Sequence, residues 1–179
     1  MRKILAILGA MLLMSVSAIG ALAQDATPAA GIDAGNTGDP AVGDTVTYID
    51  ESGNQVATIS VDNVERGWQD FDEYYEPDAG MEYVALTLTV NSEVGRGTLE
   101  VSDYDFSLQD SDGFLWGTAF VNAADGVEIT PLDDNLNLGA GESETFLVVF
   151  EVLEGQQLTH VFWQPDSGRL LTLAMLEGV

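Results

Sequence analysis

The sequence contains no cysteine, so disulfide bonds and thiolate metal ligands are both excluded. A lipid anchor attached to an N-terminal cysteine is excluded for the same reason. Without covalent cross-links or a structural zinc site, the stability of the fold must come from a packed hydrophobic core. The length of the chain, 179 residues, is sufficient for one domain with such a core.

Histidine and lysine are nearly absent as well. His160 is the only histidine, and the only lysine is Lys3. A serine triad would need His160 as its base, and the chain has no G-x-S-x-G, phosphate-loop or H-E-x-x-H motif. His160 lies in an alternating segment, where we expect an ordinary strand residue. The sequence therefore predicts a protein that is not an enzyme.

Basic residues are scarce, because five lysines and arginines stand against 30 aspartates and glutamates, for a net charge of −25. Two of the five, Arg2 and Lys3, lie at the N-terminus, and the other three are Arg66, Arg96 and Arg169. Such a surface repels nucleic acid and anionic lipid headgroups, so we expect no nucleic acid and no membrane as partners of the exported domain. It favours cations and basic partners. Solubility, or life in a saline medium, explains the same acidity.

The N-terminus has the layout of a secretory signal peptide. Arg2 and Lys3 precede an apolar run that ends in Ala21-Leu22-Ala23, and the small residues suit cleavage before Gln24. A retained membrane anchor is the alternative, but no basic stop-transfer cluster follows the run. We therefore expect secretion to the extracellular side.

The segment after the leader, 24–42, holds almost no large apolar side chain. It cannot bury enough surface to offset the entropy lost on ordering, so we expect a flexible linker. The predicted organisation is a signal peptide at 1–23, a linker at 24–42 and one domain at 43–177.

From residue 43 onward, apolar and polar residues alternate as they do in β-strands with one buried face. In the clearest case, segment 81–90, every second residue is aliphatic: Val84, Leu86, Leu88 and Val90. Comparable segments are 45–49, 55–64, 104–108, 114–120, 145–152, 159–164 and 169–176. Turn residues separate several of them, at 50–54, 110–113 and 165–168. About eight strands and no clear helix predict an antiparallel sandwich or barrel.

The order of several segments resembles a known family. They are AVGDTVTY at 41–48, VATISVDNVER at 56–66, GMEYVALTLTVN at 80–91, YDFSLQDSDGFLW at 104–116 and LNLGAGESETFLVVFEV at 136–152. Together they resemble the secreted bacterial family of unknown function with a telokin-like immunoglobulin fold. The mycobacterial immunoprotective extracellular antigen belongs to the same structural group.

This resemblance implies an all-β fold, an antiparallel immunoglobulin-like β-sandwich of about 7–9 strands. It also implies a non-catalytic extracellular module. The chain departs from the family at Ala140-Gly141, where many members carry Pro-Gly, and this bears on the rigidity of that turn. The family supplies no ligand and no site residues that can be carried over.

The stretch QDSDG at 109–113 has some residues of a calcium loop. With Gly113 at position six of the EF-hand template, Asp112 and Asp110 fill ligand positions, but Leu108 and Ala119 fall at the first and last ones. Neither can bind calcium through its side chain, so the sequence favours a hairpin turn. Weak metal candidates remain among the acidic loop residues: Asp110, Asp112, Asp133 and Asp134.

The loop GWQDFDEYYEPDAG at 67–80 combines aromatic rings with carboxylates. Rings in a long loop are typical of recognition surfaces, and carboxylates beside them favour a basic partner. Alternatively, the rings fold back over an open end of the sandwich while the acids stay in solvent. The candidate binding residues are Trp68, Asp70, Phe71, Asp72, Glu73, Tyr74, Tyr75 and Glu76.

We therefore expect an exported, monomeric, non-catalytic module, extracellular or associated with the cell envelope, that binds an unknown protein or basic ligand. One alternative is a calcium-stabilised acidic domain whose loops order around the ion. A weaker alternative is a hydrolase that uses two carboxylates. No cofactor other than Ca²⁺ is expected.

The excess of negative charge predicts that added NaCl raises the melting temperature. Repulsion among carboxylates is screened beyond about 8 Å at physiological salt and beyond about 3 Å at 1 M, so salt stabilises the compact state. Thermal melts followed by circular dichroism across this salt range are the measurement. A melting temperature that stays flat or falls would show that self-repulsion does not limit stability.

Overall fold

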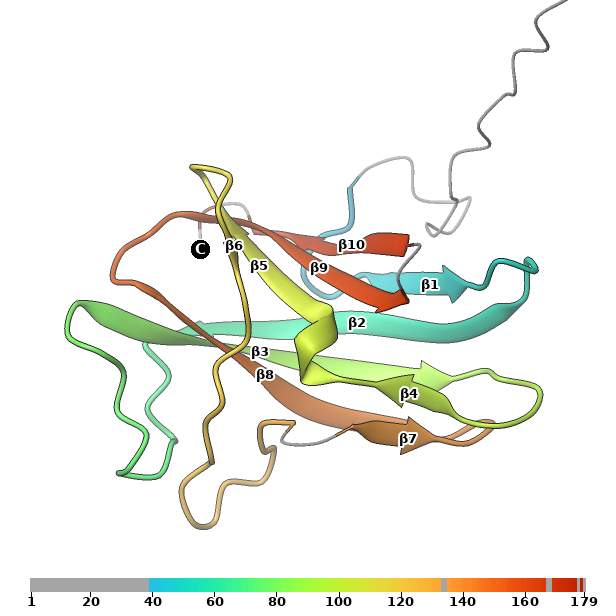
Figure 1. Ribbon diagram of the computed structural model, residues 1–179, viewed down its shortest axis with the longest axis horizontal. Helices are drawn as coiled ribbons and strands as arrows, with labels where there is room; N and C mark the ends of the chain where they lie inside the picture. The colour runs from blue at the N-terminus through green and yellow to red at the C-terminus, as the bar shows by residue number, and fades with distance from the viewer. Residues whose placement is uncertain (1–38, 133–134, 167–168, 177, 179) are drawn as a thin grey trace, which may run out of the picture.

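The computed structural model describes residues 39–132, 135–166, 169–176 and 178 (Figure 1). The expected signal peptide at 1–23 and residues 24–38 of the expected linker lie outside the described residues. The end of that linker is described, and Pro40 is buried. Its carbonyl accepts a hydrogen bond from the N–H of Met175 at 2.7 Å, and Ala41 forms a β-bridge with Met175. Packed structure is thus described from Pro40 onward.

Within the described residues, ten strands form three sheets with antiparallel ladders. The first sheet, in spatial order, contains β1 (Thr45–Ile49), β2 (Gln55–Arg66), β3 (Met81–Ser92) and β8 (Ser143–Leu153). The second contains β10 (Arg169–Met175), β9 (Leu158–Asp166), β5 (Phe106–Asp110) and β6 (Leu115–Trp116). The third pairs β4 (Leu99–Val101) with β7 (Leu136–Leu138). Figure 1 shows the two larger sheets lying against each other, which confirms the predicted β-sandwich.

The strands that the sequence predicts are present, with two differences. The expected strand at 114–120 is reduced to β6, and the short pair β4 and β7 was not expected. A strand of two or three residues contains too few positions for a period of two to be recognised. The described residues contain only one helical element, the 3-10 turn η1 (Asp103–Asp105), and no helix long and apolar enough to span a membrane.

The main core lies between the two four-stranded sheets. Val84, Leu86, Leu88 and Val90 of β3 are all completely buried in it, which confirms the alternation expected for this strand. Across the core, Trp163 of β9 is buried as well and packs against aromatic rings from β1 and β5. Each fully buried aliphatic side chain contributes about 1.5–3 kcal/mol to folding. Burial in this core is therefore the main source of stability in a chain that has no disulfides.

The expected turns connect neighbouring strands where they are described. The turn at 50–54 joins β1 to β2, and the turn at 110–113 joins β5 to β6. In the first of these, the Asp50 carboxylate accepts hydrogen bonds from the N–H groups of Ser52 at 2.9 Å and Asn54 at 2.8 Å. Residues 167–168 of the third expected turn lie outside the described residues.

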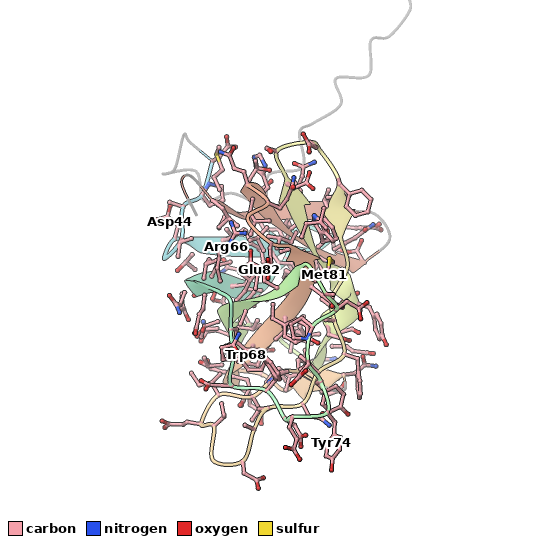
Figure 2. The ribbon with its side chains drawn as sticks, turned by 90° about the vertical axis from the view of Figure 1, so that its left-hand side faces the viewer. Asp44, Arg66, Trp68, Tyr74, Met81 and Glu82 are labelled. Carbon is pink, nitrogen blue, oxygen red and sulfur yellow. The ribbon has the colours of Figure 1, made fainter. Side chains whose placement is uncertain are left out.

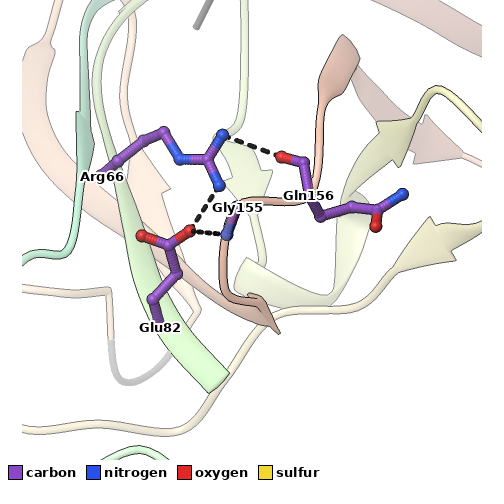
Figure 3. Close-up of polar contacts among 4 residues, drawn as sticks. All are labelled: Arg66, Glu82, Gly155 and Gln156. Carbon is purple, nitrogen blue, oxygen red and sulfur yellow. Dashed lines mark hydrogen bonds and ion pairs between the residues drawn. The ribbon is translucent and has the colours of Figure 1, made fainter. Parts of the chain in front are cut away.

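A polar clamp joins the end of β2, the start of β3 and the turn between β8 and β9 (Figure 3). Arg66 forms an ion pair with Glu82 and also donates to the carbonyl of Gln156 at 2.8 Å. The N–H of Gly155 donates to the same Glu82 carboxylate at 3.0 Å. Partial burial would raise the pKa of Glu82, but the hydrogen bonds from Arg66 and Gly155 hold it below its usual value. The clamp fixes both ends of the loop 67–80.

Replacing Arg66 with methionine should therefore lower the free energy of unfolding by about 1–3 kcal/mol, because a charged hydrogen-bond donor is lost at a partly buried carboxylate. Arg96→Met is the matched control, since it removes the same charge from an exposed loop position. Urea denaturation of both variants measures the difference. Equal losses would mean that only the net charge matters at position 66.

Candidate functional site

Two segments that are far apart in the sequence lie side by side over the outer face of the first sheet. They are the loop 67–80 and the crossover 117–132 (Figure 1). The N–H of Asp72 donates to the carbonyl of Asn122 at 2.9 Å, and the N–H of Ala124 donates to the carbonyl of Asp70 at 2.8 Å. An antiparallel bridge pairs Phe71 with Ala123. The two loops are therefore held together by their main chains.

The crossover is in turn attached to the outer edge of β8. The N–H of Ala119 donates to the carbonyl of Val149 at 2.8 Å, and the N–H of Leu147 donates to the carbonyl of Thr130 at 3.0 Å. Pro131, which the sequence excludes from a central strand position, forms a parallel bridge with Leu147 at this edge. The crossover is thus hydrogen-bonded to β8, and the loop 67–80 is hydrogen-bonded to the crossover.

A second hydrophobic cluster fills the space between these loops and the sheet. Trp68 is only 2% exposed and packs against Phe71 and Tyr83, with ring centroids 5.9 and 6.4 Å away. Figure 2 shows Trp68 pointing into the molecule. The expectation that β3 is buried on one face is therefore wrong at its start, where Tyr83 and Ala85 are buried on the other face. Burial raises the pKa of Tyr83, and nearby carboxylates add to the shift.

Exposed aromatic rings lie on top of this cluster. Tyr74 is 84% exposed and Phe120 is 65% exposed. Tyr75, which is half-buried, packs edge-on against Phe120 with centroids 6.0 Å apart, and its hydroxyl accepts a hydrogen bond from the Asn122 amide at 2.9 Å. In Figure 2, Tyr74 projects from the end of the molecule farthest from Asp44. Tyr74, Tyr75 and Phe120, with the carboxylates of Asp72, Glu73 and Glu76, are called here the acidic aromatic surface.

Among the described residues, no arginine forms an ion pair with the carboxylates of this surface. In the part of the chain that the structure describes, the one ion pair joins Arg66 to Glu82. Asp72 shapes the loop, since its side chain accepts a hydrogen bond from the N–H of Tyr74 at 3.1 Å. Glu73 and Glu76 are exposed. The surface therefore presents negative charge next to rings, which is the chemistry that attracts a lysine or arginine side chain.

The structure divides the eight candidate binding residues into two groups. Those that lie in or against the second cluster are Trp68, Phe71 and Tyr75. Those that face solvent are Asp70, Glu73, Tyr74 and Glu76, with Asp72 half-exposed beside them. The structure thus brings the predicted residues together in one region, but Trp68 anchors the loop and presents no accessible ring.

Two residues of this region were not among the candidates. Phe120 and Asn122 come from the crossover, and the sequence assigns Phe120 to a strand because it ends the apolar run 114–120. The glycine at 117, inside that run, was the available signal that the strand stops early. A hollow of about 290 Å³ lies beside Asn122, lined by crossover residues that include Asp125 and Thr130.

The tetrapeptide at 110–113 forms a hairpin turn, as the sequence favours. One oxygen of Asp110 accepts the N–H groups of Asp112 at 3.0 Å and Phe114 at 2.9 Å, and the other accepts the Trp116 indole N–H at 3.0 Å. Gly113 takes a φ of 85°, which is favourable only for glycine. Burial would raise the pKa of Asp110, but these hydrogen bonds outweigh it and lower the pKa. Asp110 acts here as the acceptor that closes the turn.

The other metal candidates do not join Asp110. Asp112 is exposed and accepts a hydrogen bond from the Gln156 amide at 3.3 Å. Asp133 and Asp134 lie outside the described residues. Among the residues that the structure does describe, no group of three or more histidine, cysteine or acidic side chains is placed to hold a metal ion.

His160 lies on β9 and stacks on Phe162 with ring centroids 5.6 Å apart and planes inclined by 9°. Its Nδ1 is buried and has no hydrogen-bond partner. The ring contact with Phe162 places His160 among the packed residues of β9.

The role of Asp110 predicts a pH-dependent effect of Asp110→Asn. The folded-state pKa lies below the ordinary value near 4, so the carboxylate stabilises the fold above that pH and this contribution is lost as the pH falls through the folded-state pKa. The asparagine variant should be less stable at neutral pH, because its NH₂ group faces the Trp116 indole N–H. Denaturation at about pH 7 and about pH 3 should show the difference from wild type shrinking in acid.

Glu51→Gln is the control for this measurement, because it removes an exposed carboxylate from the turn of another hairpin, between β1 and β2. Its stability should follow that of the wild type at both pH values. A difference for Asp110→Asn that stays constant with pH would contradict the assigned role of the charge.

No family model matches the chain, and no curated protein matches it. Among solved structures, its fold is similar to that of the secreted protein MPT63 from Mycobacterium tuberculosis, with a TM-score of 0.56, 21% identity, and coverage of 76% of this chain and 95% of that one. A candidate lipoprotein (ycdA) from Bacillus subtilis matches with a TM-score of 0.48 and 16% identity over 71% of this chain and 37% of that chain. A conserved hypothetical protein from Bacillus anthracis matches with a TM-score of 0.45 and 11% identity, covering 76% and 96%. The expected likeness to a secreted mycobacterial protein is thus confirmed for the fold.

Proposed function

We propose that the chain is an exported, non-catalytic β-sandwich module that binds a basic segment of a partner protein through the acidic aromatic surface. The observation that carries the proposal is the pair of exposed rings, Tyr74 and Phe120, on two loops that are paired through their main chains. Tyr75 contacts Phe120, and Asp72, Glu73 and Glu76 lie on the same loop as Tyr74 and Tyr75. A lysine or arginine side chain can stack on such a ring while its charge meets a carboxylate.

The ordered setting of these rings favours binding. The loop 67–80 is anchored beneath by Trp68 and at both ends by the clamp of Arg66 and Glu82. A partner would therefore not have to order the loop, and the entropy cost of binding falls mainly on its own basic segment. Tyrosine and phenylalanine also lose little side-chain entropy when they are buried. Each cation and ring contact contributes about 0.5–2 kcal/mol.

Export and the absence of catalysis have separate support. The leader-like N-terminus favours export to the extracellular side or the envelope. MPT63, whose fold is similar, is a secreted protein. The resemblance to the telokin-like immunoglobulin family implies the same location and a non-catalytic role.

A labelled oligoarginine peptide is a suitable probe for the proposed chemistry. Fluorescence anisotropy should show that it binds the exported domain and that binding weakens as NaCl rises. Tyr74→Ala and Phe120→Ala should each weaken binding about tenfold, which corresponds to about 1.4 kcal/mol. Both side chains are exposed, so the variants should keep the wild-type melting temperature.

Tyr104→Ala is the matched control. Tyr104 is 83% exposed and lies between Asp103 and Asp105, but it is a single ring on the 3-10 turn η1, away from the two paired loops that form the acidic aromatic surface. Its loss should leave peptide binding unchanged. No weakening in any variant would show that the peptide responds only to overall charge. Equal weakening in all three would show that it binds any exposed ring beside carboxylates, and either result would contradict the proposal.

A further inference from the structure

The loop between β3 and β4, residues 93–98, carries an arginine that has no partner. Arg96 is exposed and takes part in no ion pair or hydrogen bond with the residues that the structure describes. Figure 1 shows this loop at the end of the sandwich opposite the loop 67–80. Arg96 is therefore remote from the acidic aromatic surface.

The main chain around Arg96 is open to solvent. Within the described part of the chain, residues 94–97 form no main-chain hydrogen bond. A Cβ added at Gly95 or Gly97 would meet no atom within 4 Å, so both neighbours of Arg96 face open space. Exposed loop tips with small residues are the preferred sites of proteolytic cleavage.

The loop is anchored on both sides of this open segment. The N–H of Glu93 donates to the carbonyl of Val56 at 2.9 Å, and Val94 packs against the main core. On the other side, Leu99 begins β4 and is buried. A protease would therefore have to move only the residues between these anchors, and both neighbouring strands would keep their places.

The other basic residues of the chain are less accessible to such an enzyme. Arg66 ends β2 in the polar clamp, and Arg169 of β10 donates to two main-chain carbonyls of the hairpin between β1 and β2. Cleavage after either one would require a strand to leave its sheet. Arg2 and Lys3 lie in the expected signal peptide. In the exported domain, Arg96 is thus the arginine that a protease reaches without unfolding a strand.

We propose that the bond between Arg96 and Gly97 is a processing site for a trypsin-like serine protease. Enzymes of this class select arginine through a carboxylate in their specificity pocket. The residues next to Arg96, at 94–95 and 97–98, are uncharged, so no adjacent acid repels that pocket.

The reaction is an ordinary peptide hydrolysis. The serine hydroxyl of the protease attacks the carbonyl carbon of Arg96, and the C–N bond to Gly97 breaks as the leaving nitrogen takes a proton from the histidine of the protease. Water then hydrolyses the acyl-enzyme. The products are a new carboxylate at Arg96 and a new amino terminus at Gly97.

The product is a two-chain molecule that stays folded. The fragment 24–96 contains β1, β2 and β3, and the fragment 97–179 contains β4 to β10. The central strand β3 pairs with β8 along almost its whole length, and the main core takes side chains from both fragments. These contacts survive the cut, because the cleaved bond lies outside them.

Cleavage makes the stability of the protein depend on its concentration. Once the loop is cut, unfolding also separates the fragments, so the melting temperature should fall and should rise again with protein concentration. The two loops of the acidic aromatic surface come from different fragments, since 67–80 precedes the cut and 117–132 follows it. That surface then lasts only while the fragments stay paired, whereas the cleavage itself does not require that the surface binds a partner.

Limited digestion of the folded exported domain with trypsin tests the proposal. Mass spectrometry should show a single early cut that gives the fragments 24–96 and 97–179, and size-exclusion chromatography should show both in one peak. Arg96→Met, also the control for Arg66→Met, should be cut at least about a hundredfold more slowly, because cleavage must then wait for a strand to unfold. Arg96→Lys should be cut as the wild type is, because trypsin accepts lysine.

Asn91→Arg, made in the Arg96→Met background, is the matched control. Asn91 is exposed and close to Arg96 in the sequence, but it lies in β3 and is paired with Thr58 on one side and Ser143 on the other. An arginine at this position should resist trypsin, which separates openness of the main chain from exposure of the side chain.

Three results would overturn the proposal. They are a first cut at another arginine, equally fast cutting of the wild type and Arg96→Met, and separation of the fragments in the absence of denaturant. Rapid cutting at the arginine introduced in β3 would overturn the role assigned to the loop. None of these results bears on binding of the basic peptide, which is measured on the intact chain.

Discussion

The ion pair between Arg66 and Glu82 is a polar junction at the edge of the core, where the ends of three strands meet. Arg66 ends β2, Glu82 lies at the start of β3, and both reach the turn between β8 and β9 through Gln156 and Gly155. The loop between the paired residues is therefore closed at its base by a short polar bridge. This closure acts together with the buried Trp68 and the hydrogen bonds to the crossover to hold the loop that displays Tyr74.

The scarcity of cations gives the arginines a structural role. Arg169 of β10 donates to the carbonyls of Ile49 and Asp50, and so it attaches the second sheet to the hairpin between β1 and β2. Arg66 and Arg169 are thus engaged at junctions between elements. In the described part of the chain, no arginine forms an ion pair with the carboxylates of the acidic aromatic surface. The fold depends on burial of apolar side chains and on the hydrogen bonds of Arg66 and Arg169, whereas most of the negative charge lies on exposed side chains.

Alternation in the sequence predicts the long strands well, because a strand such as β3 has enough residues to display a period of two. It does not predict that Tyr83 and Ala85, on the other face of β3, are also buried. They are covered by the loop 67–80 and the crossover, whose apolar residues follow no regular alternation. For the same reason the sequence groups Trp68 with Tyr74, although one ring lies under the loop and the other on it. The cluster of aromatic residues in the sequence identifies the region. Only the tertiary structure shows that Trp68 is buried beneath the loop and that Tyr74 is exposed on it.

The crossover that carries Phe120 also covers the outer edge of β8, through the hydrogen bonds of Ala119 and Thr130. This strand contains the run FLVVF, which combines high β-propensity with no charge. An uncovered edge of this kind would recruit strands from other molecules and promote aggregation. The proposed binding surface and the protection of an aggregation-prone edge therefore depend on the same segment. A partner that pulled the crossover away from β8 would uncover this edge.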